Sequence, residues 1–292
     1  MRANIPLLAV GMPVYNGAAY LREALDTLLA QDYSGFTLLI SDDCSTDTTA
    51  DICREYAKRD PRIQFEENPR NMGMMWNFNR VLARARTEYF MWAAQDDRRA
   101  PNYISTLLNP LQAHPHAALC SAQVVKIRTD GQHIATIPFP RTANDNALVT
   151  IKQLLMETEA GWGYGVYRTS ALRPVFARSY RTGITWGWDM LVLLDLILNQ
   201  KIIGCNDTIF YQRKTGLSAK VYMPKSLSQH AWLAKRFLPT TIQILWSANL
   251  RAATKLRLVP SVARFIEFKC LHLRLYRTMA RRTPPKRNHA RA

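Results

Sequence analysis

The stretch Ser41-Asp42-Asp43-Cys44-Ser45-Thr46-Asp47 decides how the first half of this chain folds. It follows an apolar run at 36–40 that reads as a buried strand, and it leads into a segment with helical spacing. Adjacent carboxylates raise each other's pKa, and burial raises both, so such a pair is costly unless a ligand or cation compensates. A second pair, Asp96-Asp97, follows another apolar run at 89–93. Two strand ends with paired acids predict one polar site along the edge of an open sheet.

Strand and helix patterns alternate around these two acidic pairs through the first 125 residues. Short apolar runs predict strands, and apolar residues at helical spacing predict helices. The predicted strands are 7–12, 36–40, 63–65, 89–93 and 117–125, and the predicted helices are 18–30, 46–58, 76–86 and 101–111. This order predicts an α/β fold whose mostly parallel, Rossmann-like sheet is flanked by helices. The turns at 13–16, 42–47 and 94–98 then lie at carboxyl ends of strands, where such sheets bind ligands.

Beyond residue 125 the pattern is less regular. We expect a strand at 161–168, a helix at 188–198 and a strand at 201–212, followed by helices that break near Pro224, Pro239 and Pro260. The resulting domains are a main domain at 1–220 and a basic helical region at 221–292. The main domain divides into a nucleotide-binding half at 1–125 and an acceptor half at 126–220, and the last ten residues are expected to be disordered.

The net charge of +17 is concentrated at the end of the chain. Residues 227–292 carry 14 basic residues and one acid, whereas the first 226 carry 25 and 21. The basic residues alternate with aromatic and aliphatic side chains, a pattern typical of helices that lie on an anionic membrane surface. Two alternatives stay open for this region, namely helices that simply pack on the body and a nucleic-acid-binding tail.

The cysteines and the apolar runs bear on where the protein works. Five cysteines, at 44, 53, 120, 205 and 270, show neither Cys-x-x-Cys nor zinc spacing, and their odd number favours a reducing compartment. The first residues have no signal-peptide pattern, and no run reaches the 18 uncharged apolar residues of a spanning helix. We therefore expect a cytoplasmic protein that lies peripherally on the cytoplasmic face of a membrane.

Several motifs resemble one known family when they are taken in order. The matching motifs are Pro13-Val14-Tyr15-Asn16, the acidic turn at 41–47, Asn71-x-Gly73-x-x-x-Asn77-x-Asn79, the strand end Tyr89-Phe90-x-Trp92-Ala93-Ala94-x-Asp96-Asp97, Gly165-Val166-Tyr167-Arg168, Trp188-Asp189 and Tyr211-Gln212-Arg213-Lys214. Together they resemble the nucleotide-sugar-dependent glycosyltransferases of family 2, which have the GT-A fold. The resemblance covers roughly residues 5 to 218, and its specificity comes from the order and spacing of the motifs.

The resemblance implies a role for each matching residue. Pro13, Tyr15 and Asn16 would line the base and ribose pocket. Asp43, with Asp42 beside it, would accept a hydrogen bond from the base or ribose.

The remaining roles concern the phosphates and the reaction. Asp96 would lie near the ribose and phosphates, and Asp97 would bind a divalent cation, Mg²⁺ or Mn²⁺. Asp189 would be the general base, and Arg213 and Lys214 would face the leaving diphosphate.

The chain departs from the family pattern in two places. Many members have an Asp where this chain has Ala94, so the metal site rests on fewer carboxylates. Relatives often place a His where Thr215-Gly216 stands here, which leaves the diphosphate clamp only partly supported.

The reaction that the resemblance implies is an inverting transfer of a sugar from a nucleotide diphosphate donor. Among the donor nucleotides, the resemblance favours UDP over GDP or dTDP. The acceptor would be a hydroxyl of a glycan or a lipid-linked molecule, as in surface polysaccharide biosynthesis. The cation and cationic side chains would neutralise the leaving group, and a positioned carboxylate would take the acceptor proton.

Each acidic motif also has a plain structural interpretation. Asp42-Asp43 could form a turn with Asx hydrogen bonds, Asp96-Asp97 could cap the next helix, and Asp189 could be an acid favoured by the dipole of its helix. A protein that binds a nucleotide sugar without transfer, and a nucleic-acid-binding protein, remain alternative functions. A dinucleotide-dependent oxidoreductase fits less well, because the first strand lacks the Gly-x-Gly-x-x-Gly turn.

Overall fold

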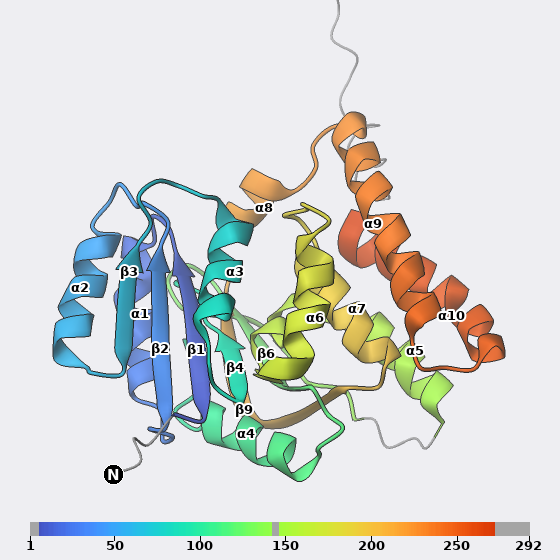
Figure 1. Cartoon of the computed structure of the whole chain (residues 1–292), viewed down its shortest axis with the longest axis horizontal. Helices are drawn as coiled ribbons and strands as arrows, with labels where there is room; N and C mark the ends of the chain where they lie inside the picture. The colour runs from blue at the N-terminus through green and yellow to red at the C-terminus, as the bar shows by residue number, and fades with distance from the viewer. Residues whose placement is uncertain (1–5, 142–145, 272–292) are drawn as a thin grey trace, which may run out of the picture.

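The computed structural model describes residues 6–141 and 146–271, and its centre is one nine-stranded sheet flanked by helices (Figure 1). The strand order is β3-β2-β1-β4-β8-β6-β9-β5, with β7 paired to β6. The strands are β1 (Leu8–Val14), β2 (Phe36–Asp42), β3 (Ile63–Glu67), β4 (Tyr89–Trp92), β5 (Arg98–Arg99), β6 (Leu119–Ile127), β7 (His133–Ile137), β8 (Val166–Arg168) and β9 (Ile202–Arg213). The predicted α/β class is confirmed.

The first half is a parallel sheet, as the alternating pattern predicted. β3, β2, β1 and β4 pair in parallel in that order. They are connected by α1 (Ala18–Leu29), α2 (Thr49–Arg59) and α3 (Met74–Arg84), and α4 (Tyr103–Ala113) follows the last of them. In Figure 1, α3 lies in front of the sheet and α1 behind it. α3 packs closely over β1 because Gly11 has no side chain: an added Cβ would lie 2.9 Å from Val81 Cγ2 of α3.

The second half of the sheet is mixed rather than parallel. β8 is antiparallel to both β4 and β6, and only β6 and β9 pair in parallel. The predicted strand at 161–168 is mostly wrong: residues 160–164 form a 3₁₀ turn, η1 (Ala160–Tyr164), and only the last three residues are a strand. Gly165 separates the two, and a Cβ there would lie 2.2 Å from the Cys120 carbonyl oxygen. This close approach joins the two halves of the sheet.

Helices cover the second half. They are α5 (Ala147–Glu157), α6 (Thr169–Tyr180), α7 (Trp188–Leu198), α8 (Leu217–Tyr222), α9 (Leu227–Ser247) and α10 (Ala252–Phe265), followed by the π-helical turn η2 (Ile266–Leu271). The predicted breaks at Pro239 and Pro260 are wrong, because both prolines lie inside helices. α9 stays one helix because buried side chains before and after its proline, such as Phe237, pack it against the core. The stabilisation from this packing outweighs the loss of the one backbone hydrogen bond that a proline removes.

α9 and α10 share the hydrophobic core of the sheet. α9 packs on α7, and α10 packs on α5, which itself contacts α7. Trp92 lies near the middle of this core, with its ring centroid 5.2 Å from that of Phe176, 5.6 Å from that of Tyr167 and 5.5 Å from that of Trp188.

None of the helices in the described ranges is both long and apolar enough to cross a bilayer. The ten residues predicted to be disordered lie outside the described ranges.

Candidate active site

Three turns gather at one edge of the sheet because β1, β2 and β4 run parallel. The backbone N–H of Asn16 donates to Ser45 Oγ at 2.9 Å, and that of Tyr15 donates to Gln95 Oε1 at 2.8 Å. The turns at 13–16, 42–47 and 94–98 therefore form one continuous edge. Pro13, Tyr15 and Asn16 lie on it, and the Tyr15 side chain is exposed.

Asp42 closes its own turn. Its two carboxylate oxygens accept from the backbone N–H of Ser45 at 2.9 Å and from the Ser45 hydroxyl at 2.5 Å. Its side chain is buried, at 1% exposure. The Asx-turn interpretation therefore describes what this residue does in the structure, and its expected contact with a ligand stays a prediction.

Asp43 clamps the loop at 68–73 to the end of β2. Its Oδ1 accepts from Asn68 Nδ2 at 3.0 Å and from the Met72 N–H at 2.8 Å, and its Oδ2 accepts from the Gly73 N–H at 2.8 Å. A carboxylate can accept about four hydrogen bonds, so Asp43 could accept one more, from a donor group of a ligand.

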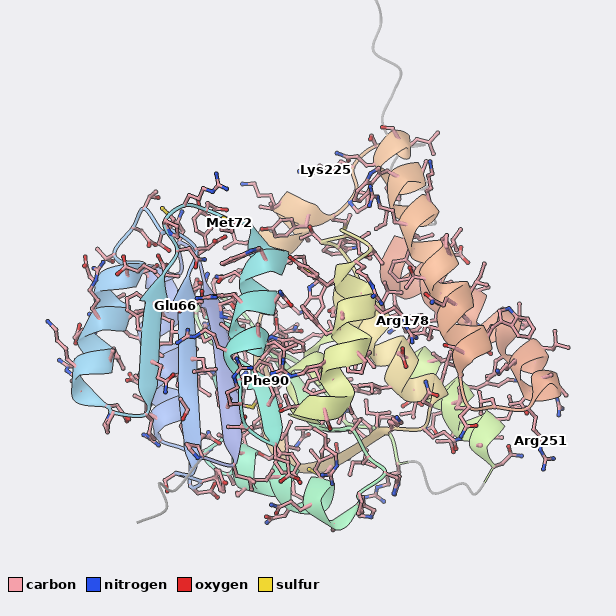
Figure 2. The ribbon with its side chains drawn as sticks, in the orientation of Figure 1. Glu66, Met72, Phe90, Arg178, Lys225 and Arg251 are labelled. Atoms are coloured by element: carbon pink, nitrogen blue, oxygen red, sulfur yellow. The ribbon has the colours of Figure 1, made fainter. Side chains whose placement is uncertain are left out.

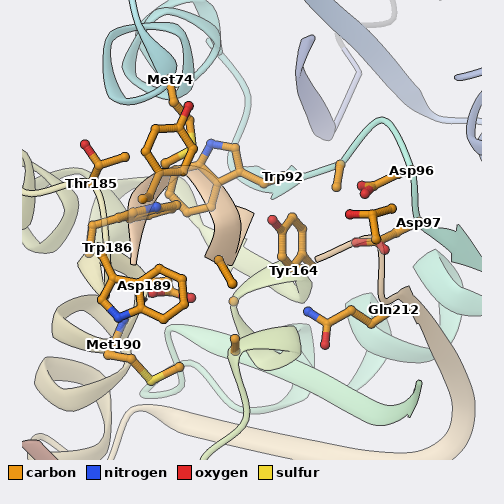
Figure 3. Close-up of a pocket in the computed structure, with 18 of the residues that line it drawn as sticks. Met74, Trp92, Asp96, Asp97, Tyr164, Thr185, Trp186, Asp189, Met190 and Gln212 are labelled. Atoms are coloured by element: carbon orange, nitrogen blue, oxygen red, sulfur yellow. Dashed lines mark hydrogen bonds between the residues drawn. The ribbon is translucent and has the colours of Figure 1, made fainter. Parts of the chain in front are cut away.

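Asp96 and Asp97 follow β4 and lie side by side on the right of Figure 3. Asp97 is 4% exposed, and its Oδ1 accepts from the Arg213 N–H at 2.8 Å. Burial, together with the charge of Asp96, raises the pKa of Asp97 to about 7. Burial also raises the pKa of Asp96. Adjacent carboxylates, of which Asp97 is buried and Asp96 half-buried, favour a cation beside them.

Asp189 lies on the opposite side of the same view, in the first turn of α7. The preceding Gly187 has φ +80°, a left-handed conformation that favours glycine and turns the chain into the helix. Asp189 Oδ1 accepts from the Met190 N–H at 3.0 Å. Burial raises the pKa of Asp189 to about 6. The helix-dipole interpretation thus explains its position, while the raised pKa suits a proton acceptor at neutral pH.

Tyr164 shows that the three acids are close together. It lies between Asp97 and Asp189 in Figure 3. Burial raises its pKa well above the ordinary value, and the negative charges of Asp97, Asp96 and Asp189 each add to that rise.

Arg213 and Lys214 leave β9 at the same edge, but they behave differently. The Arg213 guanidinium donates to the Asp96 carbonyl oxygen at 3.0 Å and to the Thr129 carbonyl oxygen at 2.8 Å, and it pairs with Glu23. Most of its donors are thus used within the protein. Within the described residues, the Lys214 ammonium donates a single hydrogen bond, to Gln212 Oε1 at 2.7 Å. Lys214 is the more available of the two predicted cations.

One cavity of about 390 Å³ collects much of the predicted site. Its wall includes Asp96, Asp97, Asp189, Arg213 and Lys214. The predicted base-pocket residues, by contrast, lie along the adjoining edge rather than in the wall; these are Pro13, Tyr15, Asn16, Asp42 and Asp43.

The two parts of the site meet at Tyr222 of α8. Its side chain lines the cavity, and its pKa is raised by burial and then by the charges of Asp43 and Tyr15. The sequence analysis did not assign Tyr164, Gln212, Tyr222 or Lys269 to the site. Tyr164, Tyr222 and Lys269 lie in helices and turns that offer no local pattern pointing to a ligand. Gln212 lies within the matching motif Tyr211-Gln212-Arg213-Lys214, but only the two residues after it were given a role.

The residues present fit a divalent cation bound mainly by its substrate. Within 6–141 and 146–271, no cluster of three or more His, Cys, Asp or Glu side chains is arranged around a metal position. Mg²⁺ in nucleotide sites is commonly held by one or two carboxylates plus phosphate oxygens and water. Asp97 and its neighbour Asp96 would supply these one or two carboxylates.

Comparisons with known proteins bear on the family and the fold. The model of the family described as glycosyl transferase family 2 matches residues 9–172. A putative colanic acid biosynthesis glycosyl transferase, WcaA of Escherichia coli, is 35% identical over 165 residues, 55% of this chain and 58% of the relative. Glycosyltransferase GlyA of Streptococcus pneumoniae is 33% identical over 214 residues, 71% of this chain and 30% of the relative. The chain therefore matches less than two thirds of the length of these curated relatives.

Solved structures show the same fold. Staphylococcus aureus TarS 1–349 in complex with UDP-GlcNAc superposes with a TM-score of 0.71 at 20% identity, covering 96% of this chain and 76% of TarS. This likeness confirms the expected GT-A type of architecture.

Proposed function

The chain belongs to glycosyl transferase family 2, and from this premise we propose that it transfers a sugar from a nucleoside diphosphate-sugar to a hydroxyl of a glycan or lipid-linked acceptor, with inversion at the sugar carbon. The observation that carries the proposal is the common cavity of Asp96, Asp97 and Asp189, which come from distant segments. Two acids at the diphosphate end and one acid across the cavity match the needs of a single displacement.

Asp189 acts as the general base in this proposal. The acceptor oxygen forms a bond to the anomeric carbon, its proton passes to the Asp189 carboxylate, and the bond from that carbon to the diphosphate oxygen breaks. With a pKa of about 6, Asp189 is ionised at pH 7 to 8 yet basic enough to take a proton.

The leaving diphosphate is held at the other end of the cavity. Lys214 offers an ammonium to its oxygens, whereas Arg213 fixes Asp97 through its backbone N–H and keeps the chain in place through Glu23. A bound Mg²⁺ or Mn²⁺ would neutralise charge on the leaving group. Asp97 would hold this cation, with Asp96 toward the ribose and phosphates.

The nucleoside would lie along the edge beside the cavity. Tyr15 provides an exposed ring there, next to Pro13 and Asn16, and Asp43 keeps one acceptor position for a base or ribose donor. UDP is the proposed nucleotide, which the structure of TarS with UDP-GlcNAc supports. GDP remains the second candidate, since a Pyrobaculum calidifontis mannosyltransferase structure of TM-score 0.50 contains GDP-Man and Mn²⁺.

A thermal-shift panel tests the donor proposal. The protein is melted with UDP, GDP, dTDP and their sugar conjugates, each with and without Mg²⁺ or Mn²⁺. We expect one nucleotide to raise the melting temperature in a cation-dependent way, because a ligand that binds only the folded state stabilises it. The Asp97→Ala variant should lose that cation-dependent shift.

The matched control is Asp51→Ala, whose side chain is 75% exposed and pairs with Arg54 on the surface of α2. It should keep the shift. If no nucleotide or nucleotide sugar moves the melting temperature of the wild type, the proposed donor class is wrong.

We place the enzyme at a membrane surface through the outer faces of α9 and α10. Large apolar side chains are exposed along these faces, namely Trp232, Leu238, Ile242, Trp246, Leu256 and Val259. Basic residues lie among them, including Lys235, Arg251 and Arg257. An apolar strip flanked by cations is what an anionic lipid surface attracts. This location would suit a lipid-linked acceptor in polysaccharide biosynthesis at the cytoplasmic face.

Liposome co-sedimentation separates this proposal from nucleic-acid binding. We expect binding to vesicles with anionic lipid and about tenfold weaker binding after Trp232→Ser with Trp246→Ser, since both indoles would leave the interface. Tight DNA binding with a steep salt dependence, unaffected by vesicles, would instead favour the nucleic-acid alternative.

A further inference from the structure

Lys269 brings a basic side chain from the end of the chain into the wall of the cavity. It belongs to η2, whose neighbours Phe265, Ile266 and Leu271 are at most 6% exposed and anchor the turn. Lys269 itself is partly exposed and lines the same cavity as Trp186 and Asp189. A region outside the match to the family model therefore completes the wall.

The charge of Lys269 is not balanced by the protein. Arg213, the buried cation of the cavity wall, pairs with Glu23, and Lys214 lies where the charges of Asp97 and Asp96 act on it. For Lys269, in contrast, the described part of the chain provides no hydrogen bond or ion pair. Because a diphosphate with its cation would use the Asp97 and Lys214 end, Lys269 remains available for a different negative group.

Trp186 lines the same cavity as Lys269. Arg236 of α9 donates to the Thr182 carbonyl oxygen at 2.8 Å and so ties the loop before α7 to the C-terminal helices. Trp186 is partly exposed, and Figure 3 shows it beside Asp189 and Met190. Trp188, in contrast, is 9% exposed and packs edge-on against Phe78. Of the two tryptophans around Gly187, the first is the one that a sugar ring can contact.

We propose that Trp186 and Lys269 form an acceptor subsite for an anionic sugar, one that carries a carboxylate or phosphate. Its ring would lie against Trp186, its negative group would pair with Lys269, and its hydroxyl would face Asp189. The inference rests on the proposed transfer reaction and adds the chemical class of the acceptor to it. An ammonium and an aromatic ring that line one cavity are common means of recognising such a molecule.

Ligand-observed NMR titrations test the subsite with defined probes. Methyl β-D-glucuronide, methyl β-D-glucoside 6-phosphate and neutral methyl β-D-glucoside are titrated into the full chain, with and without UDP and Mg²⁺. We expect at least one anionic glycoside to bind about fivefold more tightly than the neutral one, the advantage of one partly exposed ion pair. The two anionic probes distinguish a carboxylate from a phosphate.

Lys269→Met should abolish that preference while leaving UDP affinity unchanged, and Lys58→Met, an exposed lysine on α2, should keep both. The subsite is overturned if the wild type binds no anionic glycoside, if it binds all three alike, or if Lys269→Met weakens UDP instead. A failure of the proposed donor chemistry would show separately, as absence of UDP binding in every variant, because the glycosides are also titrated without nucleotide.

Discussion

Asp189 combines an observed structural role with the proposed role of general base. Its carboxylate accepts the Met190 N–H at the start of α7, where a negative charge is favoured, and burial still raises its pKa to about 6. The two effects oppose each other, and burial is the larger. Burial raises the pKa into a range that would suit proton transfer. It also raises the free-energy cost of ionising the carboxyl group in the folded protein.

The first prediction concerns activity. Since the base must be ionised, kcat/KM for transfer should fall about tenfold per pH unit below pH 6. Asp189→Asn should lower the rate by about 10²- to 10⁴-fold, the usual contribution of general-base catalysis, with the UDP thermal shift intact. Unchanged turnover in this variant would remove Asp189 as the base. If the wild type binds UDP-sugar but transfers to no acceptor, the binding-only alternative gains support.

The second prediction concerns stability. Because the folded pKa of Asp189 is raised, the native state holds the proton more tightly, and the carboxyl's contribution to stability falls as pH rises from about 4 to about 6. Asp189→Asn stays neutral and should be more stable than the wild type at pH 8 by about 1–2 kcal/mol, with less gain at pH 4.5. Urea unfolding at both pH values measures this. A destabilised variant at pH 8 would contradict it.

At the scale of elements, Asp43 joins the end of β2 to the loop that precedes α3. Three donors from 68–73 converge on its carboxylate, and its side chain is 2% exposed. The helix begins at Met74, directly after Gly73 with φ +90°. The acid thus fixes both the edge of the proposed nucleotide site and the start of α3.

We therefore predict that Asp43→Ala destabilises the protein by about 2–4 kcal/mol, because buried N–H groups of Met72 and Gly73 lose their acceptor. Chemical denaturation measures the change in the free energy of unfolding. Asp51→Ala, which removes an exposed acid on α2, is the control and should cost less than about 0.5 kcal/mol. Equal effects of the two substitutions would show that the clamp contributes little.

At the scale of the whole molecule, the C-terminal helices are continuous with the core of the sheet. Phe237 is fully buried where α9 packs on α7, and α7 begins with the proposed base. The proposed catalytic edge and the proposed membrane face therefore belong to one packed body (Figure 1), and Figure 2 shows side chains filling the space between its helices.

From this packing we predict a single unfolding transition that includes the C-terminal helices. Phe237→Ala should lower the free energy of unfolding by about 3–5 kcal/mol, since it leaves a large cavity in the shared core. Leu238→Ala, the next residue and 41% exposed, should cost less than about 1 kcal/mol. A separate early transition of the helical tail in calorimetry would show instead that α9 and α10 unfold independently.

The order of the elements could be read from the sequence because it depends on local patterns. Apolar runs and helical spacing gave four strands and their helices in the first half, and parallel order then placed the acids at one edge. The helix at 188–198 was predicted with its observed bounds. The predicted strand at 161–168 and the breaks at Pro239 and Pro260 failed, because close packing at Gly165 and burial around Phe237 override local propensity.

Which side chains face the cavity was decided only by the tertiary structure. The sequence by itself determined the fold family, the acidic pairs and the position of Asp189. It could not show that Arg213 uses most of its donors within the protein. Nor could it show that Lys269 and Trp186, more than eighty positions apart in the chain, line one cavity. Local patterns report which residues form an element, whereas the direction and charge balance of a side chain depend on neighbours that only folding brings together.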